Sequence, residues 1–203
     1  MTERQTPSGL AGVSFGWIAG HGDARGTFRE LWRAEAFEDL DPALAGAAVD
    51  RASRPVTRDP IRFVQANLST SAPGVLRGLH LHRRQLDHWV VASGRAFVAL
   101  VDVRPLIERT GPHPIVETRV LAANATVTIP VGVAHGFLAL EALELLYFVT
   151  NTYDGTDELG FAWDDSAVAV PWPIVGTPDG RPILSARDDA NPSLAELVAT
   201  LRA

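Results

Sequence analysis

Short apolar segments fill the chain from Ile61 to Thr150, and this pattern constrains the fold more than any other feature. The segments are rich in branched and aromatic residues, which favour strands. Clusters of Gly, Pro, Asn and Asp separate them at intervals of roughly 8–15 residues, a spacing typical of an antiparallel sandwich or barrel. Between two of them, Ser93–Gly94 predicts a hairpin turn. The predicted strands are IRFVQANLS, VLRGLHLH, HWVVAS, RAFVALVDV, ETRVLA, TVTIP, HGFLAL and LELLYFVT.

Before this β-rich region, the sequence predicts one strand and one helix. Residues 1–12 look loose, and residues 13–18 favour a first strand. Residues 39–50 favour a short helix, because Asp41 suits an N-cap and Pro42 suits the first helical position. A polar, proline-containing connector then leads into the predicted strands.

A helix is also predicted at the C-terminus, over residues 191–203, after a loop-like stretch that follows Pro171. Ser193 and Glu196 have the spacing of a capping box, which marks the start of a helix. The apolar residues after them recur on one helical face, so we expect this helix to dock on the body of the protein. That face consists of Leu194, Leu197, Val198 and Leu201.

Length and composition favour one domain, 1–203, with a substantial core. The net charge of −6 argues against a broad nucleic-acid-binding surface. The chain has no cysteine, which excludes disulfides and thiolate metal sites and suits a reducing compartment. The N-terminus lacks a secretory pattern, and the apolar run 12–20 is too short to cross a membrane. We therefore expect a cytoplasmic protein that binds neither nucleic acid nor membrane.

Ionisable side chains gather in the stretch GVLRGLHLHRRQLDHWVVASG, residues 74–94, which otherwise reads as strand. His80 and His82 are two residues apart, so on a strand their side chains leave the same face. Asp87 and Arg77 lie close by in the sequence. Convergent ionisable groups in an apolar setting indicate a functional site.

The spacing G-x5-HxH-x4-D-x6-G from Gly74 to Gly94, with PxGxxH at 130–135, resembles the two-part metal-binding pattern of cupins. Asp87 stands where that pattern usually has glutamate. This resemblance implies one divalent metal ion, and the ligand set alone does not choose among Zn, Fe, Mn and Ni. The ligands would be His80, His82, Asp87 and His135.

A longer ordered set of motifs covers nearly the whole chain, apart from an apparent insertion at 34–60. In order they are DxRGxFxE, QxNxS, GVLRGLH, GxxHGF, LLY, WDD and LSxRD. In this combination the chain resembles the dTDP-4-dehydrorhamnose 3,5-epimerase family, which uses a cupin barrel without a metal. The resemblance implies an all-β, cupin-type antiparallel barrel or jelly roll with a few short helices. It also implies a nucleotide-sugar substrate, no cofactor and a homodimer.

For catalysis, the resemblance implies epimerisation of a nucleotide-activated, dTDP-linked 4-keto-6-deoxy sugar at C3, C5 or both, through an enolate. His80 matches the base and Asp188 the carboxylate paired with it. Tyr147 matches the proton donor. A base and an acid are the groups that such a reaction requires, and the ordinary pKa of histidine lies near neutral pH.

For binding, the resemblance implies that several residues hold the nucleotide diphosphate and the sugar. Arginine forks suit phosphate well. Tyr153 matches a ring stacked on thymine, and Arg187 replaces a lysine of the family. His135 matches a substrate-facing histidine. The full substrate-binding set is Arg25, Glu30, Gln65, Asn67, Arg77, His135, Tyr153, Glu158 and Arg187.

Besides Arg187, two residues near His80 depart from the family pattern. Asp87 replaces the lysine of a Gln-x-Lys motif that stabilises the enolate oxygen, and His82 stands where the family usually has glutamine. An ionised aspartate would oppose an oxyanion. Either Arg83 or Arg84 supplies the missing charge, or a metal ion held by His82, Asp87 and His135 does so.

Two alternative functions follow from these departures. One is a metal-dependent cupin enzyme, an oxygenase or isomerase, in which His80 is a metal ligand and therefore not a free base. The other is a non-catalytic relative that binds a sugar nucleotide and lost turnover with the lysine.

Overall fold

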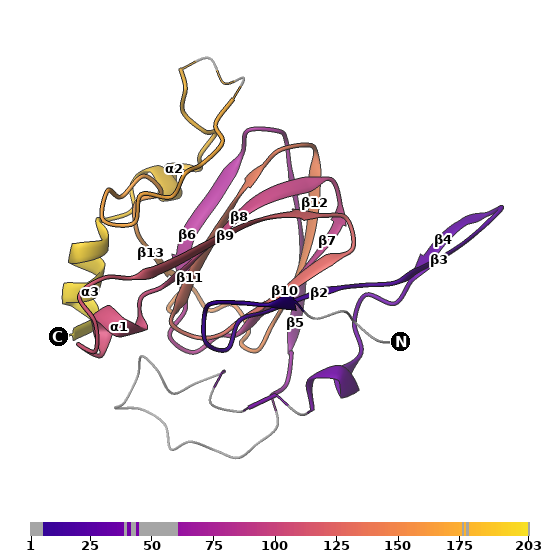
Figure 1. Cartoon of the computed structure of the whole chain (residues 1–203), viewed down its shortest axis with the longest axis horizontal. Helices are drawn as coiled ribbons and strands as arrows, with labels where there is room; N and C mark the ends of the chain where they lie inside the picture. The colour runs from indigo at the N-terminus through magenta and orange to yellow at the C-terminus, as the bar shows by residue number, and fades with distance from the viewer. Residues whose placement is uncertain are drawn as a thin grey trace.

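Two antiparallel sheets form the body of the protein in the computed structural model, which describes residues 6–38, 40, 41, 44, 61–175, 177 and 179–202. They face one another in the jelly-roll arrangement of cupins (Figure 1). The six-stranded sheet has the order β1 (Thr6–Pro7), β2 (Ser14–Trp17), β10 (Ala125–Ile129), β7 (Asp87–Ser93), β12 (Leu143–Val149) and β5 (Gln65–Ser71). The five-stranded sheet has the order β13 (Leu159–Gly160), β6 (Leu76–Leu81), β11 (Val133–Ala139), β8 (Arg95–Asp102) and β9 (Ile115–Ala122).

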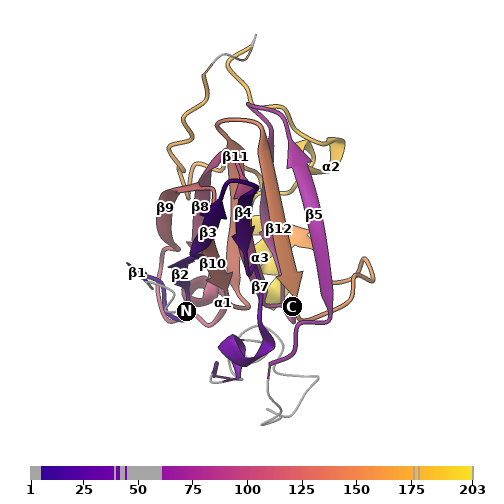
Figure 2. The ribbon, with the colours of Figure 1, turned by 90° about the vertical axis from the view of Figure 1, so that its right-hand side faces the viewer.

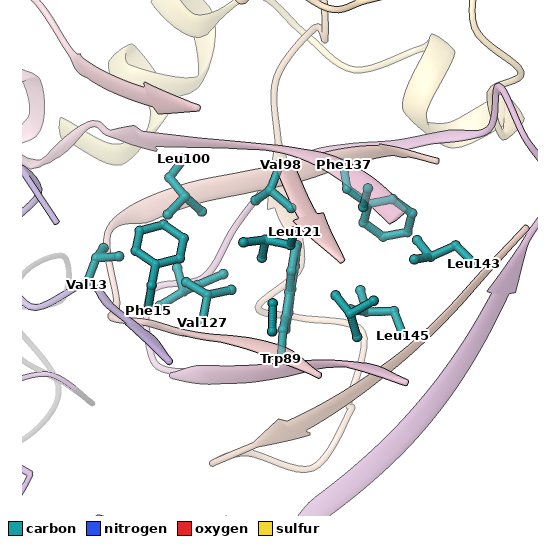
Figure 3. Close-up of a cluster of buried hydrophobic side chains, with 14 of the residues drawn as sticks. Val13, Phe15, Trp89, Val98, Leu100, Leu121, Val127, Phe137, Leu143 and Leu145 are labelled. Atoms are coloured by element: carbon teal, nitrogen blue, oxygen red, sulfur yellow. The ribbon is translucent and has the colours of Figure 1, made fainter. Parts of the chain in front are cut away.

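The main core lies between the inner faces of the two sheets (Figure 3). Alternate residues of each strand point inward, so every strand contributes side chains to the same layer. Trp89, from the middle of β7, packs edge-on against Phe137 of β11 with ring centroids 5.9 Å apart. The residues labelled in Figure 3 are Val13, Phe15, Trp89, Val98, Leu100, Leu121, Val127, Phe137, Leu143 and Leu145.

A second buried cluster covers the outer face of the five-stranded sheet. Leu79 and Leu81 of β6 and Val101 of β8 pack there against the C-terminal helix α3 (Leu194–Arg202). A short helix, α1 (Arg104–Ile107), follows β8 and lies beside α3 (Figure 1). Because α3 and the loop before it bury this face, the sheet has apolar side chains on both sides.

Beneath η1 (Ala34–Phe37), a third packed region contains a histidine. The ring of His88 lies 4.8 Å from that of Phe37 and 6.3 Å from that of Phe148, measured between centroids. Its Nδ1 is 2.9 Å from the Thr128 hydroxyl. Burial lowers the pKa of His88 to about 4, so this ring is neutral at physiological pH.

The two-stranded hairpin of β3 (Gly20–Asp23) and β4 (Gly26–Arg29) projects away from both sheets (Figures 1 and 2). All of β3 and most of β4 are exposed. Phe28 of β4 is 72% exposed, which is unusual for a large apolar side chain. The hairpin therefore contributes little to the core of its own chain.

Most of the predicted secondary structure is confirmed. Each predicted strand between 61 and 150 is present, and residues 13–18 contain β2. The capping box is present, because the Ser193 N–H donates to the Glu196 carboxylate at 2.8 Å. Most of the predicted helix over 39–50 and most of the insertion at 34–60 lie outside the described residues. None of the described helices is long and apolar enough to cross a membrane.

Three expectations were wrong. Ser93–Gly94 does not make a hairpin, because β7 and β8 belong to different sheets and the chain crosses between them there. Gly94 has a φ of +81° and its backbone packs against that of Ala142, so the glycine serves a close approach. Residues 1–12 include the short strand β1, and the stretch after Pro171 contains the helix α2 (Ala186–Asp189).

Candidate active site

A cavity of about 440 Å³ opens between the two sheets at one end of the barrel. Its walls come from β6 and β11 on one side and from β5, β7 and β12 on the other. The loop after β12 and the helix α2 complete it. Nearly all the predicted site residues line this cavity, namely His80, Asp188, Tyr147, Gln65, Asn67, Arg77, His135, Tyr153, Glu158 and Arg187.

His80 and Asp188 form a hydrogen-bonded pair, although they are far apart in the sequence. The Nε2 atom of His80 lies 2.7 Å from Oδ1 of Asp188, and the two side chains are 21% and 6% exposed. Asp188 belongs to α2, which Ser185 caps by accepting the Asp188 N–H at 3.0 Å. The cap fixes the start of α2 and so places the carboxylate against the ring.

The protonation of this pair follows from its surroundings. Burial alone would raise the pKa of Asp188. The hydrogen bond and charge of His80 and the charge of Arg187 lower it by more than burial raises it, so the pKa lies below its usual range. The ionised carboxylate accepts the Nε2–H of His80. A neutral ring then carries its lone pair on Nδ1, where it can accept a proton.

A local irregularity in β6 places both Arg77 and His80 on the cavity side. His80 pairs with His135 and Arg77 pairs with Phe137, so three steps on β6 match two on β11. Gly78 lies inside this irregularity with a φ of +124°. A Cβ there would lie 2.6 Å from Cα of Gly136 on β11. Only glycine allows the two strands to approach this closely.

Tyr147 lies on the opposite wall from His80, because β12 belongs to the six-stranded sheet and β6 to the five-stranded one. Burial and the negative charge of Asp87 raise the pKa of Tyr147. Its hydroxyl therefore stays protonated at neutral pH and can donate a proton. A base on one wall and an acid on the other can reach two faces of a molecule bound between them.

Two further histidines face the cavity with their tautomers fixed by backbone carbonyls. Nδ1 of His82 donates to the Asp157 carbonyl at 2.6 Å, and Nδ1 of His135 donates to the Val133 carbonyl at 3.1 Å. Both rings are buried. Burial lowers the pKa of His135 to about 4, although the charge of Asp87 partly offsets this effect. His135 is therefore neutral at pH 7, with its lone pair on Nε2.

Asp87 lies beside these rings and is 4% exposed. Its Oδ1 accepts from the Gln85 amide at 2.8 Å and its Oδ2 accepts from the Trp89 indole at 3.1 Å. Nε2 of His135 is 3.6 Å from Asp87 Oδ2, too far for a hydrogen bond. One candidate ligand atom from each of His82, Asp87 and His135 lies within 4.8 Å of the others.

The ligand set expected from the cupin pattern is therefore divided in the structure. His82, Asp87 and His135 come together, whereas His80 bonds to Asp188. A metal ion could be held by the three grouped residues without occupying the nitrogen of His80 that Asp188 binds. The arrangement leaves the His80–Asp188 pair intact.

Polar side chains on β5 and the following loops shape the mouth of the cavity. Gln65 and Asn67 are two residues apart on one strand face, and their side chains are joined by a 2.9 Å hydrogen bond. The side-chain oxygen Oε1 of Gln65 also accepts the backbone N–H of Tyr153 at 3.0 Å. Tyr153 is 70% exposed, so its ring is open to a ligand at the entrance.

The three arginines of the cavity each have protein partners. Arg187 forms an ion pair with Glu158 at 2.6 Å, and Arg77 donates to the Ser71 hydroxyl at 3.1 Å. Arg84 donates to the Thr156 hydroxyl at 2.8 Å. Arg83 is absent from the cavity lining of the described residues. Of the two arginines predicted to replace the family lysine, only Arg84 is therefore placed to act.

Asp157 and Trp89 are cavity residues that sequence reasoning missed. The Asp157 carboxylate accepts the backbone N–H groups of Arg83 and Arg84, both at 2.9 Å, and so fixes the loop between β6 and β7. Its signal in the sequence is weak, because an acid one position before Glu158 looks like a surface residue. Trp89 looks like a core residue in the sequence, and only the structure shows that its indole N–H donates to Asp87.

Arg25 and Glu30 are not brought to this cavity. Arg25 lies at the turn of the β3–β4 hairpin and pairs with Asp23 at 2.6 Å. Glu30 follows the hairpin and pairs with Arg33 at 2.5 Å. These contacts are exposed, and neither residue is among the described residues that line the cavity. Within one chain, the binding set predicted from the sequence is incomplete.

A cupin-type jelly roll with a histidine–aspartate pair and a tyrosine on facing walls defines a pocket equipped for proton transfer. The chain belongs to the dTDP-4-dehydrorhamnose 3,5-epimerase family, whose model matches residues 8–196. A dTDP-4-dehydrorhamnose 3,5-epimerase of Salmonella typhimurium is 35% identical over 88% of this chain and 88% of its own. A dTDP-4-dehydrorhamnose 3-epimerase of Streptomyces niveus is 30% identical over 95% of this chain and 84% of its own.

Solved structures give the same result. A 4-keto-6-deoxy sugar epimerase from the novobiocin cluster of Streptomyces spheroides superposes with a TM-score of 0.76 at 28% identity, covering 100% of this chain and 92% of the other. An epimerase of Legionella pneumophila, solved with dTDP-4-keto-L-rhamnose, gives a TM-score of 0.77 at 28% identity, with coverage of 98% and 97%. The predicted fold and family are therefore confirmed.

Proposed function

We propose that this protein epimerises a dTDP-linked 4-keto-6-deoxy sugar at C3, C5 or both. The hydrogen bond between His80 and Asp188, facing Tyr147 across the cavity, is the observation that carries the proposal. Family membership supports it, as do the names of the relatives. Those relatives include both a 3,5-epimerase and a 3-epimerase, so the family leaves both carbons available.

The reaction needs only proton transfers. A C–H bond next to the keto group is acidic, because the electron pair it leaves moves onto the keto oxygen as an enolate. Nδ1 of His80 takes this proton, and the Asp188 carboxylate stabilises the imidazolium that forms. The Tyr147 hydroxyl returns a proton to the carbon from the opposite wall. His80 then loses its proton to solvent and Tyr147 regains one, which restores the starting state without a redox cofactor.

Binding of the nucleotide would use the polar mouth of the cavity. Arg77 and Arg187 are the cavity arginines best suited to the diphosphate, because planar guanidinium groups bind phosphate oxygens in pairs. The exposed Tyr153 ring offers a surface on which a thymine base can stack. Gln65, Asn67 and Glu158 supply hydrogen-bonding groups for the base and the sugars.

We further propose that each chain acts as a single domain within a homodimer. The β3–β4 hairpin would reach the cavity of the partner subunit and carry Arg25 and Glu30 to it. The hairpin projects from its own barrel and exposes Phe28, as expected of an element that docks elsewhere (Figure 1). Symmetric exchange of such an element is a common way to build a dimer.

Mixing two inactive variants tests the dimer. His80→Asn removes the base, and Arg25→Ala removes the residue supplied by the hairpin. If the hairpin acts across the dimer, subunit exchange gives heterodimers in which one site is fully native. Activity should then recover to about one quarter of wild type. Two variants that stay inactive after verified subunit exchange would show that each chain builds its own site.

Deuterium exchange tests the catalytic proposal. A dTDP-4-keto-6-deoxy sugar is incubated in deuterated water with wild type or with His80→Asn, and incorporation at C3 and C5 is followed by NMR. Wild type should introduce deuterium, and His80→Asn should be slower by about 10²- to 10⁴-fold. Equal rates would remove His80 as the base. Tight substrate binding without any exchange by wild type would instead indicate a non-catalytic relative.

A further inference from the structure

The group formed by His82, Asp87 and His135 has the composition of a metal site. Two imidazoles and one carboxylate suit first-row divalent cations such as Fe, Mn, Co, Ni and Zn. All three side chains are at least nine-tenths buried and face the cavity. One candidate ligand atom of each lies within 4.8 Å of the others. The set comes from two different strands and the loop between β6 and β7, so the fold, not local sequence, assembles it.

The hydrogen bonds of the two histidines orient their lone pairs. A carbonyl oxygen can only accept, so Nδ1 of His82 and of His135 must carry the proton in their bonds to Asp157 and Val133. In each neutral ring the lone pair is then on Nε2. Metal-binding histidines commonly donate their other N–H to a backbone carbonyl in this way.

The Nε2 lone pair of His135 has no hydrogen-bond donor among the described residues. It faces Oδ2 of Asp87 at 3.6 Å, which places a lone pair against a carboxylate. Nε2 of His82 has only the amide nitrogen of Gln85, at 3.3 Å. Two lone pairs and a carboxylate that converge on one part of the cavity suit a cation placed between them.

The carboxylate of Asp87 is also held in place. Gln85 and Trp89 donate one hydrogen bond to each of its oxygens, at 2.8 and 3.1 Å. Ligating carboxylates are typically fixed by such outer contacts. We propose that His82, Asp87 and His135 bind one first-row divalent metal ion inside the cavity, next to the His80–Asp188 pair but without His80 as a ligand.

The expected role of this ion, unlike its binding, rests on the proposed function. Enolate formation places negative charge on the keto oxygen, and a bound divalent cation would supply positive charge for it. The chain contains no lysine to take this role, and Arg187 of the cavity is already paired with the Glu158 carboxylate. His82 and Asp87 are also positions at which the sequence departs from the family pattern, so both changes contribute to one site.

Cobalt binding tests the proposal directly. Purified protein is treated with a chelator, dialysed and titrated with Co²⁺, while visible absorption and calorimetry are recorded. Wild type should bind one equivalent and develop the d–d bands of cobalt with nitrogen and oxygen ligands. Asp87→Asn and His135→Gln should weaken binding by at least about tenfold. Circular dichroism and thermal unfolding establish that each variant is folded.

Two matched variants locate the site. His113→Gln removes an exposed histidine in the loop before β9 and should leave the affinity unchanged. His80→Asn should also bind cobalt with wild-type affinity, because His80 is not a ligand in the proposed set. Loss of affinity in His80→Asn equal to that in His135→Gln would overturn the three-residue assignment. Absence of stoichiometric binding, or binding that Asp87→Asn leaves unchanged, would overturn the site itself.

Deuterium exchange after chelation separates this proposal from the epimerase proposal. We expect the chelated enzyme to exchange at least about tenfold more slowly and to recover on addition of the metal ion. If the chelated protein exchanges deuterium fully and binds no cobalt, the metal-site proposal is wrong and the epimerase proposal stands. If the protein binds cobalt but never exchanges deuterium, the epimerase proposal is wrong and the metal-site proposal stands.

Discussion

Two groups of histidine and aspartate share one cavity but are held in different ways. In the first, the His80 ring bonds to the carboxylate of Asp188 at 2.7 Å. In the second, the rings of His82 and His135 bond to backbone carbonyls, and Asp87 accepts only from neutral donors. A carboxylate partner stabilises a ring that gains a second proton, whereas burial keeps the ring of His135 neutral. The first group is thus built to move a proton and the second to hold a positive charge.

The largest expected loss of activity comes from Asp188→Asn, which removes the charged partner of His80. The amide has no charge to stabilise the imidazolium, and its N–H can bond to Nε2 and favour the wrong tautomer of His80. We expect kcat to fall by about 10²- to 10⁴-fold with a smaller change in KM. Asp189→Asn is the matched control, because it removes only the exposed ion pair with Arg181. Equal activity in the two variants would contradict the assignment of Asp188.

His88 shows what burial alone does to a histidine. Its folded pKa is about 4, against 6.5 in the unfolded chain. Between these values the unfolded state binds more protons, so the stability is present above pH 6.5 and is lost as pH falls toward 4. The loss attributable to this ring is roughly 3 kcal/mol.

Chemical denaturation at several pH values measures this loss. The stability of His88→Gln should depend less steeply on pH than that of wild type between pH 6.5 and 4. His113→Gln, at an exposed position, should follow wild type. The aromatic neighbours of His88 carry no charge, so the difference between the two curves belongs to this ring. Parallel curves for wild type and His88→Gln would show that the ring is not neutral in the folded state.

Tyr147→Phe separates the two proton transfers of the proposed reaction. The phenyl ring keeps the packing on β12 but cannot donate a proton. We expect formation of the epimer to fall by about 10²-fold, while His80 still removes the proton and, after exchange with deuterated solvent, returns a deuteron to the same face. A decrease in inversion that exceeds the decrease in deuterium exchange, measured in one NMR experiment, would support Tyr147 as the donor. Proportional losses would place the donor elsewhere.

The barrel could be predicted from the sequence because each strand has a local sequence pattern. Alternating apolar residues and turn formers marked every strand from β5 to β12. The error at Ser93–Gly94 has the same origin, since a glycine between two strands looks alike in a hairpin and in a crossover between sheets. The two are distinguished by contacts far along the chain, because β7 and β8 pair with strands of different sheets and Gly94 packs against Ala142.

The site residues that belong to a sequence motif could be predicted, whereas those defined by tertiary contacts could not. The motifs pointed to His80, Asp188 and Tyr147, and the cavity contains all three. The division of the expected metal ligands could not be read from spacing, because it depends on α2 bringing Asp188 to His80. Asp157 and the indole of Trp89 act through hydrogen bonds that no sequence pattern encodes.

The smallest expected effect concerns the outer contacts of the second group. Trp89→Phe removes the indole N–H that donates to Asp87 Oδ2 at 3.1 Å, but keeps an aromatic ring in the core. A carboxylate that has lost one of its two donors is less well oriented, so we expect cobalt affinity to fall by about tenfold. Deuterium exchange at saturating metal should change little, because the His80–Asp188 bond does not involve Trp89.

Trp172→Phe provides the control for this last prediction. This variant also loses an indole hydrogen bond, the one from Trp172 to the Trp163 carbonyl at 2.8 Å. Trp172 lies on the outer face of the five-stranded sheet, away from the cavity. Its cobalt affinity should equal that of wild type. If both tryptophan variants weaken cobalt binding alike, the effect reflects general loosening of the barrel. If Trp89→Phe slows exchange as strongly as Asp188→Asn, the two groups are not independent, and the division of roles between them is wrong.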